Sequence, residues 1–232
     1  MAQIYTDIPL DFTADMVLRG QGADPAVVRA RRPVLVDLAE KAIDVGAGLV
    51  SPAVIHDTFS VSKDKQTGIF LNGIYALAGE LISEQLDGAG RIALAIVTIG
   101  SALEEKIYQA GHDGDMVLSL ALDGLANAAV DMLSFWYCQK IEQQAEAAGQ
   151  SSTISFSPGM LGWSVEQGQP QVFAALQPDP QLVRLLPSGM MLPRKSASMA
   201  IGLGGQILRG GKPCKFCSMN SMCSYHQALE TP

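Results

Sequence analysis

Three cysteines and one histidine lie within thirteen residues near the end of the chain. They are Cys214, Cys217, Cys223 and His226. A Cys-x-x-Cys pair places two thiolates on one tight turn, and a third cysteine with an imidazole can complete a tetrahedral zinc site. Three cysteines can instead hold an iron–sulfur cluster whose remaining iron is bound by Cys138, the histidine, a partner or an external ligand. The spacing predicts a metal site, with an iron–sulfur cluster slightly favoured over zinc. The alternative is that these cysteines are ordinary buried thiols or a reversible redox pair that bind no metal.

Basic side chains gather in the same part of the chain. From residue 181 to residue 229 there are six lysines and arginines and no acidic residue, whereas residues 1–180 carry 10 basic and 22 acidic side chains. Lys212 and Lys215 flank Cys214, and such neighbours lower thiol pKa values and offset the negative charge of a thiolate site. We expect this basic segment either to fold against the acidic body or to surround an anion, such as a thiolate–metal cluster, a carboxylate or a phosphate.

The composition narrows the class of protein. The chain has 232 residues, 48% hydrophobic and 17% charged, which predicts a globular protein of one domain or two intimate halves. A net charge of −7 argues against a nucleic-acid partner, because affinity for phosphate backbones comes mainly from lysine and arginine. The first residues have no secretory signal, and the apolar stretch 92–97 is far shorter than a membrane helix. We therefore expect a cytoplasmic protein with reduced thiols and no membrane partner.

The elements that must position these residues mix helices and strands without regular βαβ alternation. The apolar run 91–99 is typical of a strand covered on both faces, and 53–61 and 69–71 also predict strands. Further short strands are expected at 153–156 and 197–203. This pattern favours an α+β fold with a mixed sheet over a doubly wound sheet.

The clearest helical pattern follows Asp115, where apolar residues recur at spacings of three and four and the helix ends near Gly149. It predicts a long central helix that carries Cys138, which we interpret as a core cysteine. Shorter helices are expected at 76–86 and 172–176.

A helix also begins directly after the strand 91–99. Ser101 and Glu104 stand there with the spacing of a capping box, in which the two side chains reciprocally cap a helix N-terminus. The predicted organisation is an α+β domain at 1–208 followed by a Cys-rich, metal-binding tail at 209–232.

Two proline-containing loops are candidates for ligand binding. In the first, proline fixes one φ angle and glycine permits close approach of the backbone to a ligand. Its residues are Ser157, Pro158, Gly159 and Met160. The second loop, 190–198, pairs cations with hydroxyl groups before a predicted strand. Its candidate ligand-binding residues are Arg194, Lys195 and Ser196.

Together these loops resemble the activation (reactivation) domain of cobalamin-dependent methionine synthase and its small stand-alone relatives. The likeness spans roughly 50–203 and includes the Ser-Pro-Gly turn, the Met-x-Pro-x-x-Ser-x-Ser pattern from Met191 to Ser198, and Thr98-Ile99-Gly100. The resemblance implies an α+β domain that binds S-adenosylmethionine in a shallow groove and presents it to a corrinoid carried by another domain. The small relatives often carry a C-terminal Cys cluster, which agrees with the cysteines of this chain.

The resemblance implies an accessory protein that supports reductive remethylation of a corrinoid methyltransferase with S-adenosylmethionine. Its partner would be a corrinoid protein or a cobalamin-dependent methyltransferase, and the cobalamin would come only with that partner. The chain would be at most one component of that enzyme system.

Two positions depart from the family pattern. The family typically has an arginine at the position of Ser155 and a tyrosine at the position of Met160, and a serine cannot make a bidentate contact to a carboxylate. An alternative is therefore a non-catalytic iron–sulfur or zinc-binding module that keeps the fold without S-adenosylmethionine binding. A third hypothesis is an S-adenosylmethionine-binding regulator with a structural zinc.

Overall fold

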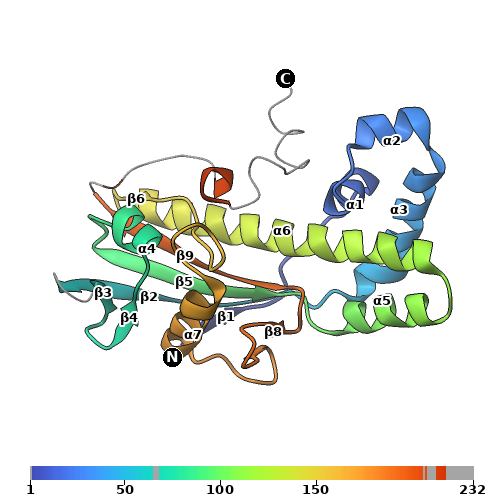
Figure 1. The fold of residues 1–232 in the computed structure, drawn as a ribbon. Helices are drawn as coiled ribbons and strands as arrows, with labels where there is room; N and C mark the ends of the chain where they lie inside the picture. Colours follow the sequence, from blue (N-terminus) through green and yellow to red (C-terminus); the bar gives the residue numbers. More distant parts are fainter. Residues whose placement is uncertain (1, 65–67, 206, 208–212, 218–232) are drawn as a thin grey trace.

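The computed structural model describes residues 2–64, 68–205, 207 and 213–217 (Figure 1). Its main element is a sheet with the strand order β4-β3-β2-β5-β9-β6, in which β1 also pairs with β2. The strands of this sheet are β1 (Gln3–Tyr5), β2 (Ala53–Asp64), β3 (Gly68–Leu71), β4 (Tyr75–Leu77), β5 (Arg91–Thr98), β6 (Ser151–Ser152) and β9 (Ser196–Gly204). A separate hairpin is formed by β7 (Arg184–Leu185) and β8 (Met191–Leu192). Each pairing between these strands is antiparallel.

Helices pack on both faces of the sheet. One face carries α1 (Ala14–Gly20), α2 (Pro25–Arg31), α3 (Val34–Gly46), α5 (Ala102–His112) and α6 (Met116–Ala147). The other carries α4 (Glu80–Gln85) and α7 (Val165–Leu176). Two short 3-10 helices are η1 (Ala47–Leu49) and η2 (Pro213–Phe216). The predicted α+β class with a long central helix is confirmed. The predicted mixed sheet is wrong, because the pairings among the described strands are antiparallel.

The central strand β5 divides the core into two layers. Because successive side chains of a strand point to opposite faces, its residues alternate between the two helical layers. The side chains on the α6 face are Ala93, Ala95 and Val97. The side chains on the α4 and α7 face are Ile92, Leu94 and Ile96. The β5 run is continuously apolar because its side chains are buried on both faces, with the smaller ones under α6 and the larger ones on the other side. The prediction of a strand covered on both faces is confirmed.

The long helix α6 begins where Asp115 accepts a hydrogen bond from the Leu118 amide, at 3.1 Å, and it ends before Gly149, whose φ is 68°. The sheet, α1, α3 and α5 all pack on it, which explains why apolar residues occur around much of its circumference. By length and composition α6 could cross a membrane, but 44% of its most apolar window is buried inside the protein. Its buried side chains belong to the core between the helices and the sheet.

The predicted helix over 76–86 is wrong in its first part. Residues Tyr75–Leu77 form β4 and pair with β3, and α4 begins only at Glu80. Gly79 separates the two elements with a φ of 154°, and a Cβ there would lie 2.9 Å from the Gly162 carbonyl oxygen. A glycine is needed at this point because the backbone leaves the sheet and passes close to another loop.

Two other predicted elements differ in extent. The helix predicted at 172–176 starts earlier, at Val165, where the Ser164 hydroxyl caps it by accepting from the Gln167 amide. The strand predicted at 153–156 is reduced to a single bridge between Phe156 and Ala200.

Candidate functional site

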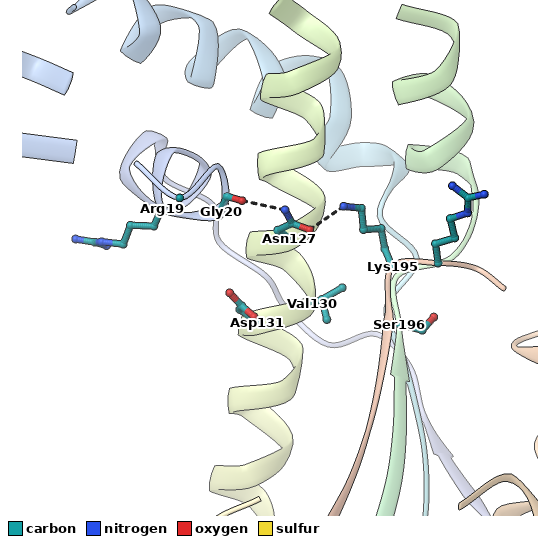
Figure 2. A pocket seen from close by; sticks show the side chains of 9 residues that line it. Arg19, Gly20, Asn127, Val130, Asp131, Lys195 and Ser196 are labelled. Atoms are coloured by element: carbon teal, nitrogen blue, oxygen red, sulfur yellow. Dashed lines mark hydrogen bonds between the residues drawn. The ribbon is translucent and has the colours of Figure 1, made fainter. Parts of the chain in front are cut away.

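The side chain of Lys195, the residue just before β9, reaches across to α6. Its Nζ lies 2.6 Å from Oδ1 of Asp123 and donates a hydrogen bond of 2.7 Å to Oδ1 of Asn127. Asn127 in turn donates to the carbonyl oxygen of Gly20, at 2.9 Å, so that α1, α6 and the start of β9 are joined in a row (Figure 2). Only 19% of the Lys195 side chain is exposed, and its charge is compensated within the protein.

Glu104 holds the backbone of the same segment. Its Oε1 accepts a hydrogen bond of 2.5 Å from the Lys195 amide. The predicted capping box is therefore wrong, because the Ser101 side chain caps no helix amide and instead donates to Glu105 at 2.9 Å. The local spacing predicted that Glu104 caps its own helix, but its carboxylate accepts a hydrogen bond from a residue 91 positions further along the chain.

Of the three candidates in the second loop, Arg194 is the one with an available charge. Its guanidinium is exposed and makes no ion pair with the described residues, whereas Lys195 is paired. Ser196 is occupied as well, because its Oγ lies 2.8 Å from both the Thr98 hydroxyl and the Pro193 carbonyl oxygen. Arg194 can therefore meet an anion without first losing a partner.

Two open cavities lie on either side of Arg194 and Lys195. The first has a volume of about 490 Å³ and the second about 640 Å³. The first is otherwise lined by Arg19, Gly20, Gly22, Asn127, Val130, Asp131 and Ser196. The second is otherwise lined by Ser101, Glu104, Glu105, Ile107, Tyr108, Gln109 and Asp123. Partial loss of water around the carboxylate of Asp131, in the wall of the first cavity, raises the pKa of this group.

The Ser-Pro-Gly turn belongs to a compact loop, residues 157–163, on the α7 side of the sheet. The Gly159 amide donates to the Trp163 carbonyl at 2.8 Å, and the Trp163 indole is fully buried with its Nε1 donating to Gln171 at 3.2 Å. A Cβ on Gly168 of α7 would lie 2.8 Å from the Pro158 ring, so the loop packs tightly against that helix.

The two predicted loop segments do not meet in either cavity. Arg194, Lys195 and Ser196 line one or both, whereas residues 157–160 line neither. The two residues that depart from the family pattern, Ser155 and Met160, make hydrogen bonds within the protein. Met160 Sδ accepts from the Ser157 amide at 3.5 Å, and the Ser155 side chain hydrogen-bonds to Cys138.

Two of the four predicted metal ligands fall within the described residues. Cys214 and Cys217 are free, half-buried thiols on the turn formed by η2, and the Cys217 amide donates to the Cys214 carbonyl at 3.1 Å. Cys223 and His226 lie outside the described residues, as does the predicted domain boundary at 208. In the described ranges no three His, Cys, Asp or Glu side chains are grouped as metal ligands, so the four-ligand shell stays a prediction.

Cys138 is part of the core, as predicted. It packs against the layer between the sheet and α6, with its Sγ 3.9 Å from the Met199 sulfur. Burial raises the pKa of its thiol, which disfavours the reactive thiolate.

Sequence reasoning missed Asp123 and Asn127 as partners of the second loop. Both lie on the predicted long helix, four residues apart and therefore on one face. Polar residues at this spacing on an otherwise apolar helix were the available signal. The partner, Lys195, could not be identified from the sequence because it lies 68 residues beyond Asn127.

No family model matches this chain, and no curated protein matches it. A search of solved structures finds the MetH reactivation domain bound to AdoHcy, with a TM-score of 0.56 and 16% sequence identity. The match covers 87% of this chain and 78% of that chain. At this identity the likeness establishes the fold alone, and the chain has the fold of the MetH reactivation domain.

Proposed function

We propose that this protein is an accessory component of corrinoid-dependent methyl transfer, which supports reductive remethylation of a corrinoid methyltransferase with S-adenosylmethionine. The observation that carries the proposal is the shared fold, over 87% of the chain, with a domain solved in complex with AdoHcy. The Ser-Pro-Gly turn and the 190–198 loop support it at the level of sequence. The corrinoid belongs to the partner and is not a resident group of this chain.

Arg194 is the residue best suited to meet the carboxylate of S-adenosylmethionine. It is exposed, its charge is unpaired among the described residues, and it lies between two cavities of ligand size. A guanidinium binds a carboxylate through two parallel hydrogen bonds, which a lysine cannot imitate.

Calorimetry with S-adenosylmethionine and AdoHcy tests this assignment. We expect Arg194→Ala to weaken binding about tenfold or more, the loss of one charge-assisted contact, and Arg194→Lys to restore little of it. Arg184→Ala, which removes an exposed arginine from the neighbouring strand β7, is the matched control and should bind like the wild type. Absence of heat at millimolar ligand would contradict ligand binding by the wild-type protein.

The partner is tested separately by an anaerobic pull-down with the full chain as bait. We expect a corrinoid protein or a cobalamin-dependent methyltransferase to be recovered, with corrinoid detected by its visible spectrum. Recovery of neither class of protein under anaerobic conditions would contradict the accessory role.

The C-terminal thiols provide a second component of the proposal. Two half-buried, unoxidised cysteines on one turn suit zinc or an iron–sulfur cluster as donors, and they are close to cations that stabilise thiolates. An iron–sulfur cluster would supply electron transfer to the corrinoid. Cys214 and Cys217 would hold it, together with Cys223 and His226.

A non-catalytic metal-binding module is the second candidate function. It is favoured by the hydrogen bonds that Met160 and Ser155 make within the protein. The Met160 sulfur accepts from the Ser157 amide in the same turn, and the Ser155 side chain is hydrogen-bonded to Cys138. A brown anaerobic preparation that loses its colour in air would support electron delivery. A colourless protein with stoichiometric zinc and no response to S-adenosylmethionine would favour the module.

A further inference from the structure

Phe216, on the turn that carries Cys214 and Cys217, contacts the 157–163 loop and the residue before it. The Leu161 amide donates a hydrogen bond of 2.9 Å to the Phe216 carbonyl oxygen. The Phe216 ring also meets the Phe156 ring edge-on, with centroids 5.5 Å apart and planes at 71°. Phe216 immediately precedes Cys217, so both contacts act on the backbone between the two thiols.

Phe216 packs on Phe156 and the 157–163 loop, and both are fixed by hydrogen bonds and burial. Phe156 is 2% exposed and exchanges two backbone hydrogen bonds with Ala200 of β9, at 2.9 and 2.8 Å. The loop beside it is closed by the Gly159–Trp163 hydrogen bond and by the buried Trp163 indole. Phe216 therefore docks onto a part of the protein that is ordered by the sheet.

The contacts of Phe216 should increase the affinity of the turn for a metal ion. A short turn that must be ordered at the moment of binding loses conformational entropy, and an anchor that orders it beforehand removes that cost. Each thiol that binds a metal ion releases one proton to solvent, so two protons leave when Cys214 and Cys217 both bind. An ordered turn presents both sulfurs to one ion without further rearrangement.

We propose that Phe216 is a positioning residue for the metal site, anchoring the Cys214–Cys217 turn to the 157–163 loop. This inference rests on the proposed metal binding by these cysteines. Because coupling between two sites is reciprocal, an ion held by the two thiols also stabilises the docked loop. Metal occupancy is thereby linked to the 157–163 loop through the hydrogen bond from Leu161, and to Phe156 through the aromatic contact.

Competition titration with Zn²⁺ on the reduced full-length protein tests the proposal. We expect Phe216→Ala to weaken Zn²⁺ binding about tenfold, the loss of an aromatic pair with its burial. Phe216→Tyr keeps the ring and the carbonyl and should remain within about twofold of the wild type. Leu161→Ala is the matched control, because the side chain of Leu161 is 59% exposed and the substitution keeps the backbone amide that donates to Phe216.

Thiol alkylation followed by mass spectrometry gives a second measurement without metal. We expect Phe216→Ala to raise the alkylation rates of Cys214 and Cys217 several-fold, while the core thiol Cys138 reacts at its wild-type rate and serves as a folding control. Unchanged Zn²⁺ affinity in Phe216→Ala would overturn the positioning role and leave the metal site standing. A wild-type protein that binds no Zn²⁺ and no iron would overturn the metal site and this inference together.

Discussion

Lys195 and Asp123 form an ion pair that joins the residue before β9 to the N-terminal third of α6. The Nζ–Oδ1 distance is 2.6 Å, and the lysine side chain is mostly buried while the carboxylate is 41% exposed. Removal of one partner from such a pair costs more than the loss of a surface salt bridge, because it leaves a charge with little access to water uncompensated. It also keeps the neighbouring Arg194 at the rim of two cavities.

Removal of this ion pair should destabilise the fold measurably. We expect Lys195→Ala to lower the free energy of unfolding by about 1 kcal/mol or more, because Asp123 and Asn127 then lose their common donor. Urea denaturation measures the change. A double-mutant cycle with Asp123→Ala should give a coupling energy above about 0.5 kcal/mol. Additive effects of the two substitutions would contradict an energetic link, and Lys41→Ala on exposed α3 surface controls for general loss of charge.

The crossing of α1 over α6 requires glycine. A Cβ on Gly20 would lie 2.2 Å from the carbonyl oxygen of Gly124, which is backbone and cannot rotate away. We therefore expect Gly20→Ala to lower stability by about 1–3 kcal/mol, despite the smaller unfolded-state entropy of alanine. Thermal or urea unfolding monitored by circular dichroism tests this. Gly48→Ala is the matched control, because a Cβ there meets no atom within 4 Å.

His56 should make stability depend on pH. The ring is 6% exposed, stacks on Tyr5 at 4.5 Å, and has no hydrogen-bond partner for either nitrogen among the described residues. Burial lowers the pKa of His56, with Asp57 opposing and Lys140 reinforcing the shift. The unfolded chain then binds a proton that the folded protein rejects, so stability is fully present above the ordinary histidine pKa of about 6.5 and falls as the pH drops below it.

The His56→Phe variant isolates this contribution. We expect its urea midpoint to change less than that of the wild type between about pH 8 and pH 5.5. At the higher pH the variant should be as stable as the wild type or more stable, because the ring is apolar and leaves no unpaired nitrogen. Equal pH dependence in the two proteins would assign the effect to other groups.

The sequence predicted those features of the fold that local pattern determines. The apolar run of β5 and the helical spacing of α6 each reflect burial on more than one side, which is visible in the residues themselves. The region 76–86 was mispredicted because Tyr75–Leu77 has no strong local preference, and pairing with β3 decides its conformation.

The surroundings of the candidate site could not be predicted for the same reason. Residue type and spacing pointed to Arg194 and the two described cysteines, and their roles stay predictions. The partners that occupy Lys195 lie on α5 and α6, 68 to 91 residues earlier in the chain, and no local pattern connects them. The contact between Phe216 and Phe156 likewise joins residues far apart in the sequence.

The adjacent residues Glu104 and Glu105 allow a long-range hydrogen bond to be compared with a local one. Glu104 is half-buried and accepts a hydrogen bond from the Lys195 amide, whereas Glu105 is exposed and accepts one from Ser101, at the start of its own helix. We expect Glu104→Ala to lower the free energy of unfolding by about 1.5–3 kcal/mol, the cost of a charge-assisted bond to a partly buried amide. Glu105→Ala should change it by less than about 0.5 kcal/mol.

The Gln variant separates charge from geometry at the same position. Glu104→Gln retains an acceptor oxygen and should recover roughly half of the stability lost in Glu104→Ala. If the amide of Lys195 anchors the second loop, hydrogen exchange at that amide should also accelerate in Glu104→Ala and stay slow in Glu105→Ala. Identical exchange in the two alanine variants would mean that the loop is held by Lys195, Asp123 and Asn127 without the carboxylate.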